Sequence, residues 1–114
     1  MLDRWPDEAG RAAYLAGLHA AQALIFERTG RVAKTHKGVH VEFWRLTAAE
    51  PGFDADHRAF LGRTYELKAA ADYLTDPVRE VTPELAKQTI HMARRLLDAV
   101  VAVLPPDTAG STQP

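Results

Sequence analysis

Helix-breaking residues divide the chain into four segments, and this division constrains the fold more than any other feature. Glycine readily takes the left-handed conformation that ends a helix, and proline cannot donate the backbone hydrogen bond that continues one. Between the breaks, apolar residues recur at steps of three and four, the period of a helix with one buried face. We therefore expect four amphipathic helices. The breaks are Gly30, Pro51-Gly52, Asp76-Pro77 and Pro105-Pro106.

Local signals mark where each predicted helix begins. Asp7 and Glu8 place negative charge in the first turn of the segment that ends at residue 29, where the helix dipole favours it. Thr35, Asp54 and Thr82 are residue types whose side chains cap helix N-termini. No stretch shows convincing strand alternation. Short links between four helices predict an all-α fold, an antiparallel up-and-down four-helix bundle.

The apolar periodicity also predicts which residues the helices bury against one another. Each segment carries one seam at helical spacing, and the four seams together are expected to form a single core. The expected seam residues are Tyr14, Leu18, Ala21 and Ile25 in the first segment; Val39, Phe43 and Leu46 in the second; Phe60, Leu67, Ala71 and Leu74 in the third; and Ala86, Ile90, Ala93, Leu97, Val100 and Leu104 in the fourth.

Length and composition limit the domain organisation and the compartment. The 114 residues suffice for one compact domain, which we place at 1–104, followed by a flexible polar tail at 105–114. With 14 Lys+Arg against 15 Asp+Glu, no molecule-wide field attracts a polyanion, so any such site must be local. The chain has no cysteine and no apolar run near the roughly 18 residues of a membrane helix. We expect a cytoplasmic protein without membrane association.

The connector after the first predicted helix is dense in basic residues. Arg31, Lys34, His36 and Lys37 cluster around Thr35, which leads into a helix N-terminus. The free amides of such a terminus can receive a phosphate. The connector is therefore a candidate nucleotide- or RNA-binding site. The alternative interpretation is a charged, solvated link, as connectors between amphipathic helices commonly are.

The end of the third predicted helix is the second candidate region. Lys68 and Asp72 lie four residues apart, as in a helical ion pair, and Tyr73 follows them. The alanines at 69–71 permit another helix to approach closely, so we expect Asp72 and Tyr73 at a helix–helix contact. The alternative is an ordinary surface ion pair, worth about 0.3–0.5 kcal/mol.

Other common site chemistries find little support in the sequence. His36 and His40 form an i,i+4 pair near Glu42, but no metalloprotease-type HExxH arrangement is present. The only serine, Ser111, lies in the predicted tail, and no glycine-rich phosphate loop occurs. We expect neither a metal nor a cofactor.

Three segments resemble one known family. The runs YLAGLHAAQALI (14–25), KTHKGV (34–39) and YELKAAADY (65–73) are similar, in order and spacing, to the small HEPN-domain proteins of the uncharacterised UPF0332 group. The likeness extends from Tyr14 into the fourth predicted helix. It implies a helical bundle, often a homodimer, in a family associated with RNA cleavage or nucleotide binding. Many members are encoded beside a minimal nucleotidyltransferase in toxin–antitoxin or related pairs.

The resemblance also bears on catalysis. The family's ribonucleases carry an arginine and, four to six residues later, a histidine on a late helix, and dimerisation completes the active site. Here Lys68 stands where the arginine is usual, and Asp72-Tyr73 replace the stretch where the histidine is expected. Arg31 and His36 also satisfy the motif's spacing, but they lie in the connector. The resemblance therefore implies weak catalysis or none.

Three functions remain open at this point. The leading interpretation is a HEPN-like module that binds a nucleotide, RNA or a nucleotidyltransferase partner. The second is a metal-independent ribonuclease toxin in which His36 is the base, and the third is a purely structural protein–protein interaction module. If the chain dimerises, we expect Phe43, Trp44 and Phe53 to be covered between subunits.

Overall fold

The structure is an all-α bundle of four helices. This computed structural model describes the backbone of residues 5–73 and 82–105, and the side chains of 5–66 and 82–105. The helices are α1 (Trp5–Thr29), α2 (His36–Thr47), α3 (Ala55–Tyr73) and α4 (Pro83–Val103), and the described residues contain no strand. The predicted fold class is confirmed. None of the described helices has the length and apolar character needed to cross a membrane. Of the predicted tail, residues 106–114 lie outside the described part of the chain.

The predicted helix starts are confirmed by their hydrogen bonds. The side chains of Thr35, Asp54 and Thr82 each accept a bond from the backbone N–H three residues later, at 2.9–3.1 Å. Each bond satisfies one of the amides that a helix start leaves without a partner. Gly30, with φ of 72°, ends α1 in the left-handed conformation that only glycine adopts at little cost.

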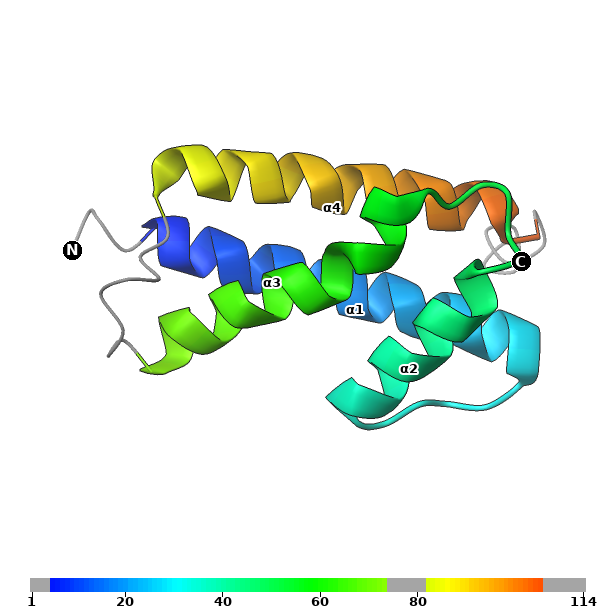
Figure 1. Ribbon diagram of the computed structural model, residues 1–114. Coiled ribbons are helices and arrows are strands. Elements are labelled where there is room, and N and C mark those ends of the chain that lie inside the picture. Colours follow the sequence, from blue (N-terminus) through cyan, green and yellow to red (C-terminus); the bar gives the residue numbers. More distant parts are fainter. Residues whose placement is uncertain (1–4, 74–81, 106–114) are drawn as a thin grey trace, which may run out of the picture.

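The direction of the helices differs from the predicted up-and-down order. Tyr14 of α1 contacts His36 at the start of α2, and Arg28 near the end of α1 pairs with Glu50 just after α2. Figure 1 shows that α1, α2 and α4 run in one direction and α3 runs in the other. The connector explains this. Residues 30–35, when extended, span about 20 Å, which is enough to return along the roughly 18 Å of the 12-residue α2.

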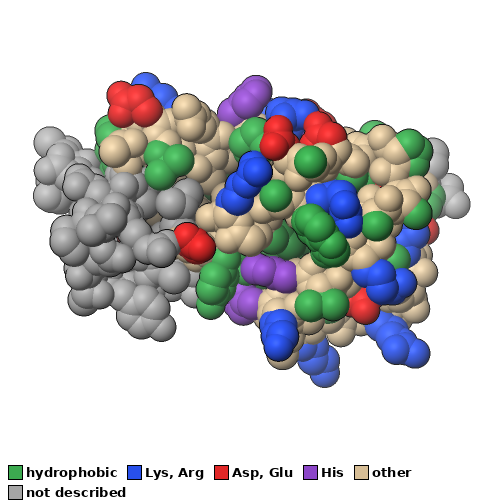
Figure 2. Space-filling view, in the orientation of Figure 1, with side chains coloured by type: hydrophobic (Ala, Val, Ile, Leu, Met, Phe, Trp, Pro, Cys, Tyr) green, Lys and Arg blue, Asp and Glu red, His purple; other side chains and the backbone are tan. Residues whose placement is uncertain are grey.

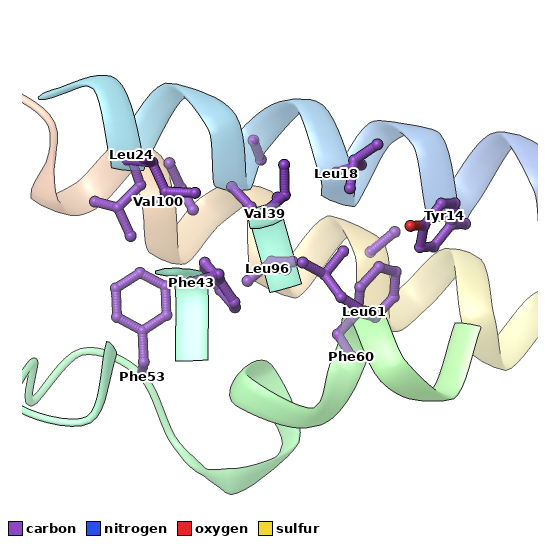
Figure 3. Packing of buried hydrophobic residues seen from close by; sticks show 14 of the residues in the cluster. Tyr14, Leu18, Leu24, Val39, Phe43, Phe53, Phe60, Leu61, Leu96 and Val100 are labelled. Atoms are coloured by element: carbon purple, nitrogen blue, oxygen red, sulfur yellow. The ribbon is translucent and has the colours of Figure 1, made fainter. Parts of the chain in front are cut away.

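Helix α1 lies at the centre and packs against all three other helices. Figure 3 shows its side chains meeting those of α2, α3 and α4 in one core. The predicted α1 seam of Tyr14, Leu18, Ala21 and Ile25 is buried, as expected. Beside this seam, a Cβ at Gly17 would collide with the ring of Phe60, so a residue without a side chain lets α1 and α3 approach closely.

The seam predicted for α4 was partly wrong. Ala86, Ala93 and Val100 are buried, but Ile90 and Leu97 are 40% and 36% exposed. Leu96 and Thr89 are buried instead. The apolar residues of α4 cover a wide part of the helix surface, so the sequence does not specify which of them face the core. Thr89 was not expected there because threonine is a polar residue type. Its hydroxyl is satisfied locally, because it donates to the carbonyl of Leu85 at 2.8 Å.

The aromatic residues expected between two subunits were also partly misassigned. Phe43 and Phe53 are buried within one chain, where their rings pack edge to face with centroids 5.9 Å apart. They need no second copy to cover them. Of the three, only Trp44 remains exposed, at 53%.

Candidate functional site

Four aromatic rings from three helices meet near the start of α2. Tyr14 of α1, His36 and His40 of α2, and Tyr65 of α3 make up this group, which we call the ring cluster. Tyr14 and His36 are stacked, with planes 5° apart and centroids at 5.6 Å. Tyr65 packs edge-on against the other three rings at 5.5–5.8 Å. The two histidines share one face because residues four apart lie above each other on a helix.

The phenol of Tyr14 joins the two histidines. Its oxygen lies 2.7 Å from Nδ1 of His36 and 2.8 Å from Nε2 of His40. A phenol carries a single proton, so it can donate to only one imidazole and must accept from the other. The three side chains therefore form one hydrogen-bonded chain, anchored at Tyr14, which is fully buried.

The surroundings of the ring cluster shift two protonation equilibria. Burial, and next the neighbouring Tyr65, raise the pKa of Tyr14 to about 12, so this phenol keeps its proton at neutral pH. Burial, and next the nearby His36, lower the pKa of His40. A neutral His40 can accept the proton of Tyr14 while His36 donates N–H to the phenol oxygen. This arrangement satisfies all three groups.

The ring cluster lies beside a helix start that carries no negative charge. The first turn of α2 contains no acidic residue and holds His36 and Lys37, with exposed Lys34 just before it. Thr35 caps this turn with a neutral hydroxyl. Figure 2 shows histidine side chains grouped on this face, with Lys or Arg side chains nearby. The positive end of the α2 dipole and these cations together favour an anion.

The predicted connector site is divided in the structure. Lys34, Thr35, His36 and Lys37 lie together at the start of α2. Arg31 instead lines a separate depression of about 400 Å³. The extended connector carries it toward the C-terminal part of α2, where Glu42 and Arg45 line the same depression. The proximity of Arg31 to His36 in sequence therefore does not become one site in space.

The second predicted region lies at the C-terminal end of α3. The backbone of Lys68, Asp72 and Tyr73 belongs to α3, as expected. Their side chains lie outside the described part of the structure. The prediction that Asp72 and Tyr73 face a helix–helix contact therefore stays a prediction.

Sequence reasoning missed three members of the ring cluster. Tyr14 was assigned to the core seam, Tyr65 appeared only within the run YELKAAADY, and His40 was considered only as part of a metal pair. The i,i+4 spacing of His36 and His40 was the available signal, because two imidazoles on one helix face need a common polar partner when partly buried. No group of three or more His, Asp or Glu side chains suited to a metal ion occurs among the described residues.

Comparison with protein families, with curated proteins and with solved structures finds no match to this chain. The geometry of the ring cluster and the start of α2 therefore carries the functional argument.

Proposed function

We propose that this chain is a HEPN-like helical module that binds a nucleotide or RNA at the ring cluster and the start of α2. One observation carries the proposal: aromatic rings lie directly beside an acid-free, positively charged helix start. A nucleotide combines the two matching features, a flat base and a phosphate. The resemblance of the KTHKGV and YELKAAADY segments adds a cytoplasmic homodimer and a nucleotidyltransferase partner, as in toxin–antitoxin-type pairs, to this proposal.

Each half of the ligand has a physical counterpart in the site. A phosphate is attracted to the amides and dipole of the α2 N-terminus and to the ammonium group of Lys37. A base can stack on the exposed rings of His36 or Tyr65. Base–aromatic stacking contributes about 1–3 kcal/mol per base. The stacking and phosphate contacts can hold the two halves of one nucleotide at the same time.

Binding without strong catalysis fits the chemistry of the site. RNA cleavage without a metal needs a base for the 2′-hydroxyl proton and a fixed cation for the charge that develops on the phosphate. Tyr14 cannot take up this proton at neutral pH, because its pKa of about 12 means that the phenol is already protonated. Lys37 is exposed, and no described side chain fixes its ammonium group. Catalysis requires tighter positioning than an exposed lysine provides.

A second candidate is the metal-independent ribonuclease, and one observation favours it. His36 and His40 share the phenol of Tyr14, so one imidazole can gain a proton while the other loses one. Such a pair can supply both a general base and a general acid. In this alternative the exposed His36 is the base.

Binding measurements with purified protein test the leading proposal. We expect AMP or a short oligoribonucleotide to bind in low salt, as measured by calorimetry or fluorescence anisotropy. Lys37→Ala should weaken binding and reduce the salt dependence by about one phosphate contact. Lys87→Ala is the matched control, because this exposed lysine lies on α4. Absence of binding to both ligands would refute the proposal, and the module would then act only through protein contacts.

Cleavage assays distinguish the ribonuclease alternative. The leading proposal predicts no turnover of RNA by the wild-type protein. In the alternative, His36→Ala lowers turnover by about 10²–10⁴ while RNA affinity is nearly unchanged. Robust cleavage that His36→Ala abolishes would replace the leading proposal with the second.

A further inference from the structure

A groove beside the ring cluster has no role in the site described so far. It runs between α2 and α3, has a volume of about 370 Å³, and is lined mainly by His40, Phe43, Trp44, Arg58, Gly62 and Arg63. We call it the α2–α3 groove. Its volume lies within the range of small-molecule sites, about 300–1,000 Å³. No acidic residue lines it.

Arg58 gives the α2–α3 groove a fixed positive charge. Its guanidinium donates to the carbonyl of Trp44 at 2.9 Å and to the hydroxyl of Thr47 at 3.2 Å. Both acceptors are neutral, and no described carboxylate pairs with this arginine. The side chain is therefore held in place while its charge stays uncompensated. An arginine in this state is suited to a phosphate, which its planar group can bind through two hydrogen bonds.

Arg63 adds a second cation at the same groove. Its only carboxylate partner among the described residues is Asp56, at 3.3 Å, and both side chains are more than half exposed. Such an exposed pair is weak and is readily exchanged for another anion. Arg63 and Asp56 also line a separate pocket between α3 and α4, so Arg63 can serve the α2–α3 groove, which it lines as well, by exchanging Asp56 for a ligand.

Trp44 supplies a flat surface next to these charges. The guanidinium of Arg58 lies over its indole ring, 4.0 Å from the centroid, and 53% of the residue remains exposed. A guanidinium stacked on an indole leaves outer faces on which a further flat ring can stack. An uncharged peptide would leave the charge of Arg58 without a counterpart. A flat heterocycle that carries a phosphate matches both features.

His40 connects the groove to the ring cluster. It lines the α2–α3 groove, and it also bonds Tyr14 within the ring cluster. The two sites therefore adjoin each other, and consecutive units of one ligand can occupy them. We propose that the α2–α3 groove is a second nucleotide subsite, with a base against Trp44 and a phosphate at Arg58 and Arg63. This inference rests on the proposed function and narrows its ligand to a single-stranded oligonucleotide.

Fluorescence of Trp44 tests this subsite directly. The chain has two tryptophans, so Trp5→Phe leaves Trp44 as the only reporter in the full-length protein. We expect a single-stranded oligoribonucleotide of about six units to quench Trp44 and to bind at least about tenfold more tightly than AMP. An oligodeoxynucleotide of the same length tests whether the sugar matters. AMP should occupy the ring cluster first, because the N-terminus of α2 adds to its phosphate contacts there, so AMP at concentrations that fill only this site should change Trp44 emission little.

Substitutions in the α2–α3 groove separate this subsite from the ring cluster. Arg63→Gln, at an exposed position, should weaken oligonucleotide binding about three- to tenfold and leave AMP binding unchanged. Arg58→Gln should do the same more strongly, with circular dichroism confirming that the helices remain. Arg94→Gln is the matched control, since Arg94 is an exposed arginine of α4 outside both sites. It should change neither affinity.

The outcomes distinguish failure of the subsite from failure of the proposed function. If AMP and the oligonucleotide bind equally and Trp44 is not quenched, the subsite is refuted while the proposed function stands. If neither binds, both are refuted. If light scattering shows a dimer in which Trp44 is shielded from acrylamide without nucleotide, a second copy covers the groove and the subsite is refuted. Quenching by the oligonucleotide that Arg63→Gln weakens and Arg94→Gln preserves would support it.

Discussion

Helices α2 and α3 begin in chemically opposite ways. At the start of α3, Asp54 accepts from the N–H of His57 at 2.9 Å and donates its own N–H to Nδ1 of His57 at 3.0 Å. Arg95 of α4 donates to the same carboxylate at 3.1 Å. Negative charge thus lies at the positive end of the helix dipole, and a cation from a neighbouring helix balances it. At the start of α3, the helix dipole and the carboxylate of Asp54 therefore both have partners of opposite charge.

The start of α2 lacks this compensation. Thr35 provides a neutral cap, and the first turn holds His36 and Lys37 without any acidic residue. Its histidines are tied to the bundle through Tyr14 rather than through their own helix end. The start of α3 is thus neutralised within the bundle, whereas the start of α2 keeps a positive potential, which the proposed function assigns to a ligand. Three predictions test this comparison, in order of decreasing effect.

Tyr14→Phe should have the largest effect. It keeps the buried ring but removes the phenol that joins His36 and His40. Leaving the partly buried imidazole of His40 without this partner should lower the free energy of unfolding by about 1–3 kcal/mol. Denaturant unfolding measures this loss. Hydrogen exchange should show faster opening of α2 and unchanged protection at the start of α3.

Thr89→Val is the control for this substitution. It removes a buried hydroxyl bond of α4 without touching either helix start. Its loss of stability should not be accompanied by selective opening of α2. Equal loosening of the two helix starts in Tyr14→Phe would contradict the separate anchoring of α2.

Acidification should weaken the two helix starts in different pH ranges. The pKa of His40 is lowered by burial and next by His36, so the unfolded chain takes up this proton at higher pH than the folded one. Stability from His40 is therefore complete above about pH 6.5 and is lost as the pH falls toward its folded pKa. Tyr14, His36 and Tyr65 face His40, and none of them is a carboxylate that could offset this loss.

The contribution of Asp54 to stability is lost in a more acidic pH range than that of His40. The pKa of Asp54 is lowered, first by the backbone bond from His57 and also by Arg95. Its contribution is present above about pH 4 and is lost as the pH falls through its folded pKa. Unfolding curves should be measured across pH. The loss of stability that begins below about pH 6.5 should disappear in His40→Gln and persist in Asp54→Asn. Persistence in both variants would contradict the assignment to His40.

Lys37→Glu should have the smallest effect on stability, but it should change stability and nucleotide binding in opposite directions. A carboxylate in the first turn of α2 complements the helix dipole and should stabilise the fold by about 0.3–1 kcal/mol. The same change should abolish nucleotide binding. Thermal unfolding and calorimetry measure the two effects. Lys87→Glu makes the same charge change on exposed α4 and should leave nucleotide binding intact.

Local chemistry made the helix starts predictable, whereas long-range geometry did not follow from it. Thr35, Asp54 and Thr82 cap their helices through bonds to residues only three positions away, so the residue types suffice. The parallel course of α1 and α2 depends on the path of the extended connector, which no residue in it specifies. The up-and-down order was therefore the wrong default.

The candidate site was predictable to a similar extent. His36 and Lys37 were identified because charge and helix position are written in the sequence. Tyr14 and Tyr65 were not, because an aromatic residue at helical spacing looks the same whether it only fills a core or also bonds a histidine. Their meeting depends on α1, α2 and α3 converging, which is a property of the folded chain.

The central position of α1 has a consequence for how the chain is made. A growing polypeptide leaves the ribosome from its N-terminus, so α1 emerges before α2, α3 and α4. Its buried face requires α2, α3 and α4, and Leu96 of α4 is among the side chains that complete the core. Until α4 is synthesised, part of the apolar surface of α1 stays open to water and to other nascent chains. Burial of the apolar face of α1 therefore waits for the synthesis of α4, and slow translation before α4 would prolong that exposure.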